Sequence, residues 1–408
     1  MPGELPRTAD LVVVGAGIVG LAVAEAVTGR DPSATVVVVD KENRVAAHQS
    51  GRNSGVLHSG IYYEPRSMKA LAAKAGREAM VRFCDDHDVA YEVCGKVVVA
   101  VDTSELAALA ALEARGIENG LTVTRLDRRG LAEAEPHADG VGALHVAETG
   151  IVDFVGACRA LAGLVEERGS SIVLGAEVTS MRTRDRGAIV VETTWGAVTA
   201  RRVVNCGGLQ SDRVAAMASA DTSGVRIIPF RGEYFDVDPT RSYLCRNLIY
   251  PVPDPRFPFL GVHLTRSVHG GVHAGPNAVV ALAREGYRRR DVRGRDAWEL
   301  VANPGMRRLA RRYWRVGAGE MYRSVNHRAF LKALQRLVPD IRLEDLHPAP
   351  AGVRAQALER SGELVDDFRF ADRPGLVNVV NAPSPAATAA LEIGRHVAER
   401  LANDGSAV

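Results

Sequence analysis

Residues 48–63, with the sequence HQSGRNSGVLHSGIYY, concentrate side chains that can hold a ligand and move a proton. His48 and His58 carry imidazoles, whose ordinary pKa of roughly 6.5 suits a group that accepts a proton near neutral pH. An Asn-Ser pair and two tyrosines add hydrogen-bonding groups, and three glycines would let the backbone pass close to a large planar ligand. An ordinary surface loop needs neither feature. We therefore predict that this segment faces a bound ligand.

The residues before this loop have the order of elements of a dinucleotide-binding unit. The apolar run Leu11–Val14 is typical of a buried parallel strand, and it leads into the G-x-G-x-x-G spacing of Gly15, Gly17 and Gly20. In this fingerprint the glycines make the tight turn, admit the pyrophosphate and let the following helix pack closely. A second apolar run ends in Asp40, where an acid accepts hydrogen bonds from the adenosine ribose. The pattern predicts a bound adenine dinucleotide.

The fingerprint alone does not choose between NAD and FAD. Two later apolar runs, residues 202–205 and 377–381, also lead into small or turn-forming residues and then a helix. A cofactor held at several strand ends of one sheet suits FAD, which is longer than NAD. We therefore expect FAD, and the residues predicted to hold it are Gly15, Gly17, Ile18, Val19, Gly20, Asp40, Lys41, His48, Gln49, Ser50, Asn53, Ser54, Gly55, Val178, Cys206, Gly207, Gly208, Ser211, Gly352, Val353, Ala382, Pro383 and Ser384.

Composition excludes several classes of protein. The chain has 408 residues, of which 46% are hydrophobic, and a net charge of +2, so nothing favours a nucleic-acid partner. Its five cysteines form no C-x-x-C pair, which indicates neither a metal site nor a disulfide framework and fits a reduced, cytoplasmic compartment. There is no apolar stretch long enough for a transmembrane helix. The arginine clusters at 288–290 and 307–311 are expected to be solvated helix faces.

The order of predicted elements indicates two domains built from separate stretches of chain. From Arg226 the character changes to runs typical of an antiparallel sheet, at 227–237, 260–265 and 272–282, followed by basic helices between 291 and 338. The chain should return to the first domain near Gly352. We expect an α/β fold with an α+β second domain. A discontinuous Rossmann-like FAD-binding domain of glutathione-reductase type would comprise residues 1–90, 145–225 and 350–408, and an antiparallel-sheet substrate-binding domain residues 91–144 and 226–349.

Several stretches together resemble one family. They are HQSGRNSGVLHSGIYY at 48–63, LGVHLTR at 260–266, GPNAVVALAREGY at 275–287, GEMYRS at 319–324, AGVRAQAL at 351–358 and NAPSPAATAAL at 381–391. With the fingerprint, they make the chain similar to bacterial L-2-hydroxyglutarate oxidases or dehydrogenases of the D-amino-acid oxidase superfamily. The resemblance covers nearly the whole chain and implies non-covalent FAD and oxidation of L-2-hydroxyglutarate to 2-oxoglutarate. One departure is Arg52, where the family leads us to expect histidine.

Oxidation of a 2-hydroxy acid moves a hydride from C2 to flavin N5 and the hydroxyl proton to a base. His58 in the loop and His263 on a predicted strand are the candidate bases, with His58 narrowly favoured, and flavin reduction should rise with pH through a pKa of roughly 6–8. A bidentate arginine is the natural partner of each substrate carboxylate, and the candidates are Arg354 and Arg323. The hydroxyls of Tyr62, Tyr63 and Tyr250 could add hydrogen bonds. Each of these residues could instead be structural.

Three readings of the function stay open at this point. The first is the flavin-dependent oxidation of a 2-hydroxy acid, the second an amine or amino-acid oxidase of the same superfamily, and the third a flavin-binding protein without catalysis. The sequence does not choose between oxygen and a quinone as the electron acceptor. A dehydrogenase that passes electrons to a quinone could touch the inner membrane at its periphery through a surface patch.

Overall fold

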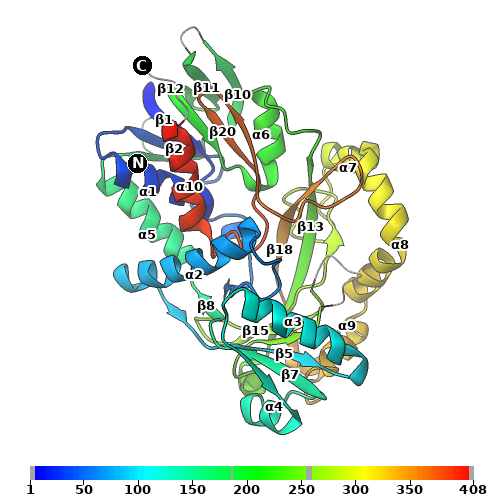
Figure 1. Ribbon diagram of the computed structural model, residues 1–408. Helices are drawn as coiled ribbons and strands as arrows, with labels where there is room; N and C mark the ends of the chain where they lie inside the picture. Colours follow the sequence, from blue (N-terminus) through cyan, green and yellow to red (C-terminus); the bar gives the residue numbers. More distant parts are fainter. Residues whose placement is uncertain (1–4, 185–186, 254–259, 404–408) are drawn as a thin grey trace.

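The computed structural model of the protein describes residues 5–184, 187–253 and 260–403 (Figure 1). Its α-helices are α1 (Ile18–Arg30), α2 (Met68–Asp86), α3 (Leu106–Glu118), α4 (Arg128–Ala134), α5 (Phe154–Glu167), α6 (Ser211–Met217), α7 (Gly294–Ala302), α8 (Pro304–Val325), α9 (His327–Gln335) and α10 (Ala390–Asn403). Its strands are β1 (Thr8–Val14), β2 (Val36–Asp40), β3 (Val56–Leu57), β4 (Tyr91–Glu92), β5 (Lys96–Ala100), β6 (Val123–Leu126), β7 (Gly142–Val146), β8 (Gly150–Val152), β9 (Ser171–Leu174), β10 (Val178–Thr183), β11 (Ile189–Thr193), β12 (Gly196–Asn205), β13 (Arg226–Val237), β14 (Ile249–Pro251), β15 (His263–Arg266), β16 (Val272–Gly275), β17 (Val279–Val280), β18 (Leu346–Leu358), β19 (Arg369–Arg373) and β20 (Leu376–Asn381).

The first sheet is a parallel sheet of the kind that the fingerprint predicts. Strands β9, β2, β1, β12 and β20 are parallel neighbours in that order, and β10, β11 and β19 add antiparallel pairs at the edges. Leu11 and Val13 of β1 pack in a core with α1 and α10, whereas Val12 and Val14 pack in a second core with Val214 of α6. Because both faces of β1 are covered, the run is apolar at every position rather than alternating.

The second sheet is mostly antiparallel and lies beside the first (Figure 1). Among the described residues its strand order is β17, β13, β16, β15, β14, β5, β7 and β6, with β18 on the other edge of β13. Three helices of the basic region, α7, α8 and α9, follow β17 and lie along the outer side of this sheet in Figure 1. A small third sheet joins β3, β8 and β4. The fold is therefore α/β with a second, antiparallel-sheet unit, as expected.

Three details differ from the sequence analysis. Strand β18 stays paired with β13 from Leu346 to Leu358, so the chain leaves the second sheet after Leu358 rather than near Gly352, because the ladder with β13 continues beyond that glycine. The run 272–282 is two short strands, β16 and β17, separated at Pro276, which has no backbone N–H for a ladder. Strand β15 begins at His263, and part of the segment before it lies outside the described residues.

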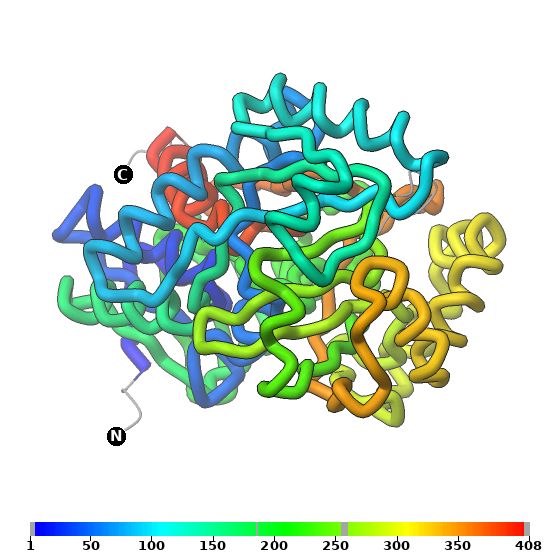
Figure 2. The backbone as a smooth tube through the Cα atoms, turned by 90° about the horizontal axis from the view of Figure 1, so that it is seen from below, coloured from blue at the N-terminus to red at the C-terminus, as the bar shows by residue number. Residues whose placement is uncertain are grey.

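Segments far apart in the sequence meet around the first sheet. Helix α10, near the C-terminus, packs on α1, near the N-terminus, and the tube in Figure 2 shows the red and blue ends of the chain together. Gly394 makes this close packing possible, because a Cβ there would lie 2.4 Å from the carbonyl oxygen of Ala22. Within the part of the chain that the structure describes, no helix is long and apolar enough to cross a membrane.

Candidate functional site

A cavity of about 1730 Å³ is lined by residues from both large sheets and from the 48–63 loop. At one end it is lined by residues at the carboxyl ends of β1, β2, β12 and β20, where a parallel sheet places ligands. Twenty-one of the 23 residues predicted to hold the cofactor line this cavity; they are Gly15, Gly17, Ile18, Val19, Asp40, Lys41, His48, Gln49, Ser50, Asn53, Ser54, Val178, Cys206, Gly207, Gly208, Ser211, Gly352, Val353, Ala382, Pro383 and Ser384. The cavity therefore connects several strand ends, as the binding site of one extended ligand would.

The other two predicted residues, Gly20 and Gly55, do not line the cavity. A Cβ on Gly20 would lie 2.0 Å from the carbonyl oxygen of Gly15, so Gly20 serves the close packing of α1 on β1. Gly55 has a φ of +66° and its carbonyl accepts from the N–H of Val152, so it shapes a turn beside β8. Both glycines act on the backbone around the cavity, and a ligand contact is not supported for either.

The fingerprint glycines have separable roles. Gly15 has a φ of +110°, and a Cβ there would lie 2.5 Å from the carbonyl oxygen of Cys206. At Gly17 a Cβ would meet only the Ser50 hydroxyl oxygen within 4 Å, at 3.1 Å, and this hydroxyl accepts from the N–H of Ile18. At Gly17, a side chain would thus occupy the space predicted for the ligand and would approach few atoms of the protein itself.

Replacing Gly17 with valine is expected to leave the purified protein with less than about a tenth of its normal flavin, because the side chain would stand where the pyrophosphate binds. The flavin content, read from absorbance after purification, measures this. Gly163→Val on α5 is the matched control, since a Cβ there meets nothing within 4 Å. Full flavin occupancy in the Gly17 variant would contradict the assignment of the fingerprint.

Asp40, the acid predicted to bind the ribose, is held by the backbone. Its Oδ2 accepts from the N–H of Ala16 at 2.7 Å and its Oδ1 from the N–H of Glu42 at 2.9 Å. Each carboxylate oxygen has a second lone pair, so the two hydrogen bonds orient the group and leave acceptor capacity toward the cavity that it lines. This geometry fits the predicted ribose contact.

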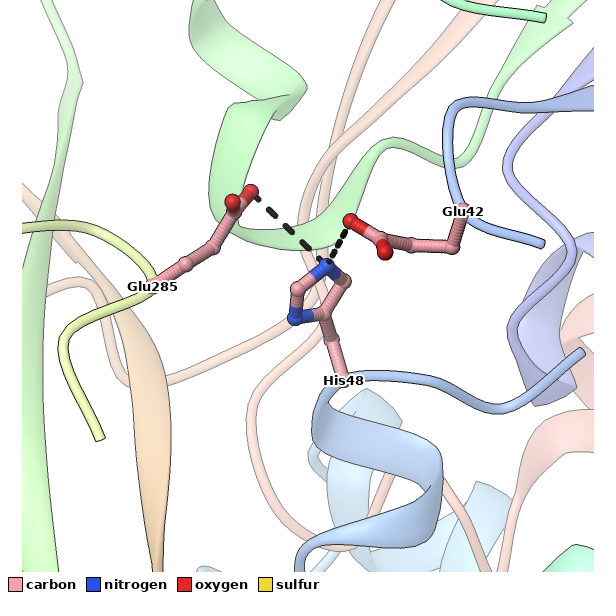
Figure 3. Close-up of side chains that lie close together, drawn as sticks. All are labelled: Glu42, His48 and Glu285. Atoms are coloured by element: carbon pink, nitrogen blue, oxygen red, sulfur yellow. Dashed lines mark hydrogen bonds and ion pairs between the residues drawn. The ribbon is translucent and has the colours of Figure 1, made fainter. Parts of the chain in front are cut away.

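Beside Asp40, the side chains of Glu42, His48 and Glu285 gather at the cavity wall (Figure 3). His48 Nε2 lies 2.9 Å from Glu42 and 3.9 Å from Glu285, and its Nδ1 lies 2.5 Å from the Tyr287 hydroxyl. The Lys41 ammonium forms ion pairs with both carboxylates. This lysine supplies positive charge to the two carboxylates, and the cluster joins the cofactor loop to the second sheet's loops.

Arg52, the departure from the family pattern, belongs to the same junction. Its guanidinium carbon lies 4.0 Å from the centre of the Tyr287 ring, and its side chain lines the cavity. Stacking of a guanidinium on an aromatic ring is favourable, so Arg52 supports the tyrosine that binds His48. The predicted role of His48 as a cofactor neighbour is thus accompanied by a structural role between the two units.

Two histidines line the cavity, His58 directly after β3 and His263 at the start of β15. His263, at the start of β15, is buried, stacks on Tyr250 with ring centres 3.9 Å apart, and has its Nδ1 2.7 Å from the carbonyl oxygen of Gly261. A carbonyl can only accept, so the neutral ring carries its proton on Nδ1 and keeps a lone pair on Nε2. His58 has its Nε2 3.2 Å from the Ser384 hydroxyl, which can donate or accept, so its tautomer is not defined.

Burial disfavours the protonated form of both imidazoles. Burial lowers the pKa of His58 to about 3, assisted by the positive charge of Lys96, and burial also lowers the pKa of His263 to about 3. These shifts run against the expected rise of flavin reduction through a pKa of roughly 6–8, because desolvation disfavours the imidazolium. A neutral imidazole able to accept a proton is present well below neutral pH.

Arg354 lies among these groups. It is on β18, opposite Phe230 of β13, and lines the cavity. Its contact with the Tyr234 hydroxyl opposes the burial that raises the pKa of that tyrosine, and its charge helps to lower the pKa values of both histidines. The structure thus brings Arg354, His58 and His263 together, as predicted from distant parts of the sequence.

The three predicted tyrosines also line the cavity, and burial raises the pKa of each hydroxyl. The hydroxyl of Tyr62 is buried without a hydrogen-bond partner among the described residues, which makes it the free donor of the set. A buried polar atom without a partner is costly, so a ligand oxygen is a reasonable expectation for Tyr62.

Arg323 requires a correction. It lies near the end of α8, forms an ion pair with Glu320 on the same helix, and is not among the residues that line the cavity. The sequence GEMYRS is helical there, so Glu320 and Arg323 are neighbours at i and i+3 and satisfy each other. The prediction that Arg323 holds a substrate carboxylate is not supported by this position.

Lys96 is a buried charged residue next to the site that the sequence did not single out. It begins β5, is 1% exposed, and its Nζ lies 4.4 Å and 4.7 Å from the ring centres of Tyr62 and Tyr250. Burial lowers the pKa of Lys96 to about 7. The signal in the sequence was a lysine at the head of the buried run KVVVA, since lysine is almost never fully buried without a reason.

Comparison with known proteins adds three findings about relatives. The family model described as FAD dependent oxidoreductase matches residues 10–400. The chain is 45% identical to an L-2-hydroxyglutarate dehydrogenase of Indibacter alkaliphilus, over 96% of this chain and 98% of the relative. It is 41% identical to an L-2-hydroxyglutarate dehydrogenase of Escherichia coli strain K12, over 96% and 93%, and 40% identical to the mitochondrial L-2-hydroxyglutarate dehydrogenase of Homo sapiens, over 96% and 88%.

Solved structures share the fold. An L-alpha-glycerophosphate oxidase from Mycoplasma pneumoniae with FAD bound superposes with a TM-score of 0.80 at 22% identity, covering 97% of this chain and 95% of that one. A glycine oxidase from Geobacillus kaustophilus gives a TM-score of 0.75 at 18% identity, covering 97% and 95%. At these identities the likeness concerns the architecture of the two sheets alone.

Proposed function

The chain belongs to the FAD dependent oxidoreductase family, and from this premise we propose that it oxidises L-2-hydroxyglutarate to 2-oxoglutarate. The observation that carries the proposal is the set of relatives with that activity in their names, 40–45% identical over nearly the whole chain. The cavity agrees with it, because Arg354 lines it together with His58 and His263, whose pKa values burial lowers. A dicarboxylate that must lose a hydroxyl proton suits such a chamber.

The cofactor's place follows from the glycines and strand ends. FAD, when bound, accepts the hydride that leaves C2 of the substrate. Gly17 and the N-terminus of α1 would face the pyrophosphate, Asp40 the ribose, and residues of the 48–63 loop and the turn after β20 the flavin end. We propose that the binding is non-covalent, so acid precipitation should release intact FAD into the supernatant.

We propose His263 as the base that takes the hydroxyl proton. Its Nδ1–H is held by the Gly261 carbonyl, which orients the ring and leaves the Nε2 lone pair for the substrate. His58, narrowly favoured from the sequence, has its Nε2 beside Ser384 instead and is better suited to orient the substrate. His263 is preferred because its surroundings define which ring nitrogen carries the proton, whereas those of His58 do not.

Arg354 is proposed to bind one substrate carboxylate in a bidentate manner. Lys96 does not line the cavity, but its Nζ lies against the rings of Tyr62 and Tyr250, which do, and its charge is proposed to attract the second carboxylate from behind them. Lys69 is also buried at the cavity wall but is paired with Asp366 at 2.9 Å. We therefore propose Arg354 for one carboxylate, as expected from the sequence, and Lys96 in place of Arg323 as the second positive charge.

The Lys96 charge predicts a pH dependence of substrate affinity. Since its pKa is lowered to about 7, Nζ is charged below that pH and neutral above it. The KM for L-2-hydroxyglutarate should rise about 10-fold between about pH 6 and pH 9, because a nearby positive charge is lost. Lys96→Met should have a high KM at every pH, and Lys96→Arg a low one that does not change with pH.

Steady-state KM values at several pH settings check this prediction. Flavin content should be equal in the three proteins, which separates a loss of charge from a loss of folding. A wild-type KM that stays constant over this range, or a Lys96→Met variant that keeps the wild-type profile, would exclude Lys96 as the titrating group.

The electrons are proposed to pass to oxygen or to a quinone. A quinone would require peripheral contact with the inner membrane from its cytoplasmic side. Reoxidation of the reduced protein in stopped flow, by oxygen and by a water-soluble quinone in parallel, distinguishes the two acceptors.

The function is tested by anaerobic bleaching of the flavin. L-2-hydroxyglutarate should reduce the bound flavin rapidly, whereas glutamate and sarcosine should not. Reduction by an amino acid in preference to the hydroxy acid would make the protein an amine or amino-acid oxidase. A yellow protein that no small acid bleaches would be a flavin-binding protein without this catalysis.

A further inference from the structure

A buried lysine in the first turn of α2 forms an ion pair with a carboxylate that lies almost wholly in solvent. The Nζ of Lys69 lies 2.9 Å from Oδ1 of Asp366, yet the Lys69 side chain is 8% exposed and the Asp366 side chain is 93% exposed. Both residues line the cavity. A carboxylate that lines the cavity and is also exposed lies where the cavity opens to solvent, so this pair is at the opening.

Other bonds hold the start of α2 in place. Asp367 accepts from the first two backbone N–H groups of the helix, at 3.2 Å and 3.1 Å, and the Ser67 hydroxyl caps the same helix. These acceptors satisfy donors that a helix N-terminus leaves open. Because Asp367 and Ser67 anchor the helix, the side-chain pair of Lys69 and Asp366 is not needed for that purpose.

Lys69 lies among the groups that surround the proposed substrate position. Its Nζ lies 4.9 Å from the centre of the Tyr63 ring, and Lys69, Tyr63 and His58 all line the cavity. Burial lowers the pKa of His58, and the charges of Lys96, Arg354 and Lys69 lower it further. Two cations that line the cavity, one on α2 and one on β18, are therefore close enough to act on the same imidazole.

We propose that Lys69 selects for a substrate with a second carboxylate, and that this carboxylate takes the place of Asp366 on the ammonium. The inference rests on the proposed oxidation of L-2-hydroxyglutarate and names the residue that binds the carboxylate farther from the hydroxyl. Arg354 then holds the carboxylate next to the reacting carbon. Lys96 acts from behind the tyrosine rings, whereas Lys69 lines the cavity and can touch the ligand.

The exchange of partners is favourable for the ammonium. Three donors belong to an ammonium group, and over the residues that the structure describes one hydrogen bond is recorded for the Lys69 Nζ, to Asp366. An exposed carboxylate gains little from such a pair, because water replaces the bond and the released side chain recovers its freedom. A dicarboxylate that Arg354 already holds presents its second carboxylate at a high effective concentration, which a monocarboxylate cannot do.

Binding of glutarate and of pentanoate to the oxidised holoenzyme, measured by titration calorimetry, tests the inference. The two acids have the same chain length, but only glutarate has a second carboxylate. Lys69→Met should weaken glutarate binding about 10-fold or more, the usual effect of losing a hydrogen bond to a charged group, and leave pentanoate binding unchanged. Lys69→Arg should keep the preference for glutarate. Lys74→Met removes an exposed lysine from the same helix and should bind both acids as the wild type does.

The Asp366→Asn variant gives a result of opposite sign. It should strengthen glutarate binding about 2- to 5-fold, because Lys69 loses the partner that competes with the ligand. The same substitution made in the Lys69→Met protein should have no effect, which separates an exchange of partners from simple repulsion between Asp366 and the ligand. Glu363→Gln removes an exposed carboxylate between β18 and β19 and should leave the affinity unchanged.

Three results overturn the inference: equal affinity of the wild type for both acids, an unchanged glutarate preference in Lys69→Met at normal flavin content, or weaker glutarate binding in Asp366→Asn. A gain from Asp366→Asn that persists without Lys69 also overturns it. The proposed function fails separately. A protein that prefers glutarate through Lys69, but whose flavin L-2-hydroxyglutarate does not reduce, would bind dicarboxylates and act on a different one.

Discussion

Replacing His263 with glutamine is expected to slow the reduction of the flavin by L-2-hydroxyglutarate by about 10²- to 10⁴-fold, the usual cost of losing a general base. The reason lies in the hydrogen bond from Nδ1 to the Gly261 carbonyl, which leaves Nε2 unprotonated beside the cavity. Glutamine can keep a hydrogen bond to that carbonyl but cannot accept the proton. Single-turnover reduction under anaerobic conditions measures the chemical step directly.

The matched variant is His58→Gln, at the second imidazole of the same cavity. Its main effect should be a weaker substrate affinity, with a smaller loss in the rate of reduction at saturation. His263 stacks on Tyr250 in a buried site, so flavin content must be compared in both variants to exclude a general loss of structure. If His58→Gln loses the rate and His263→Gln keeps it, the roles are reversed; if neither loses it, the proton leaves by another route.

The low pKa of both histidines changes the expected pH profile. Burial lowers each pKa to about 3, so the neutral base is already available at pH 5 to 6 and no increase of the reduction rate near pH 7 should come from these rings. A rise between about pH 6 and 8 that disappears in His263→Gln would mean that the bound substrate dianion raises the imidazole pKa.

Replacing Arg354 with alanine is expected to lower kcat/KM for L-2-hydroxyglutarate by about 30- to 4,000-fold, which corresponds to about 2–5 kcal/mol for the loss of one partner of a buried charge pair. Arg354 contacts Tyr234 and lies close enough to both histidines to affect their pKa values. A carboxylate bound to its guanidinium would therefore hold C2 of the substrate near the base.

Two further variants sharpen this test. Arg354→Lys keeps the charge but loses the fork of donors, so it should recover only part of the lost efficiency. Arg323→Gln on α8 is the control arginine, because it is paired with Glu320 away from the cavity, and it should keep near-normal efficiency. An Arg354→Ala enzyme with wild-type efficiency would remove Arg354 from the substrate site, and a large loss in Arg323→Gln would return Arg323 to it.

Local patterns were sufficient to predict the cofactor unit. Gly15, Gly17, Gly20 and Asp40 stand at fixed offsets within one strand-helix-strand unit, so their contacts depend on residues close in the sequence. The apolar run of β1 was sufficient to predict a strand covered on both faces, because continuous burial removes the alternation of an exposed strand. These features follow from contacts between residues close in the sequence, and the same strand-helix-strand geometry recurs in many proteins.

The substrate end of the cavity depended on pairings that no local pattern encodes. Arg354 and Arg323 were equally good candidates from their residue type. The structure distinguishes them, because the pairing of β18 with β13 positions Arg354, whereas Arg323 forms an ion pair with Glu320 on α8. No local pattern marks Lys96 as a neighbour of the site, and its position beside Tyr250 results from the pairing of β5 with β14. The sequence by itself determined the family, the cofactor and the residue types of the site; the tertiary structure decided which charges meet, because long-range strand pairing sets both the neighbours and the burial of each side chain.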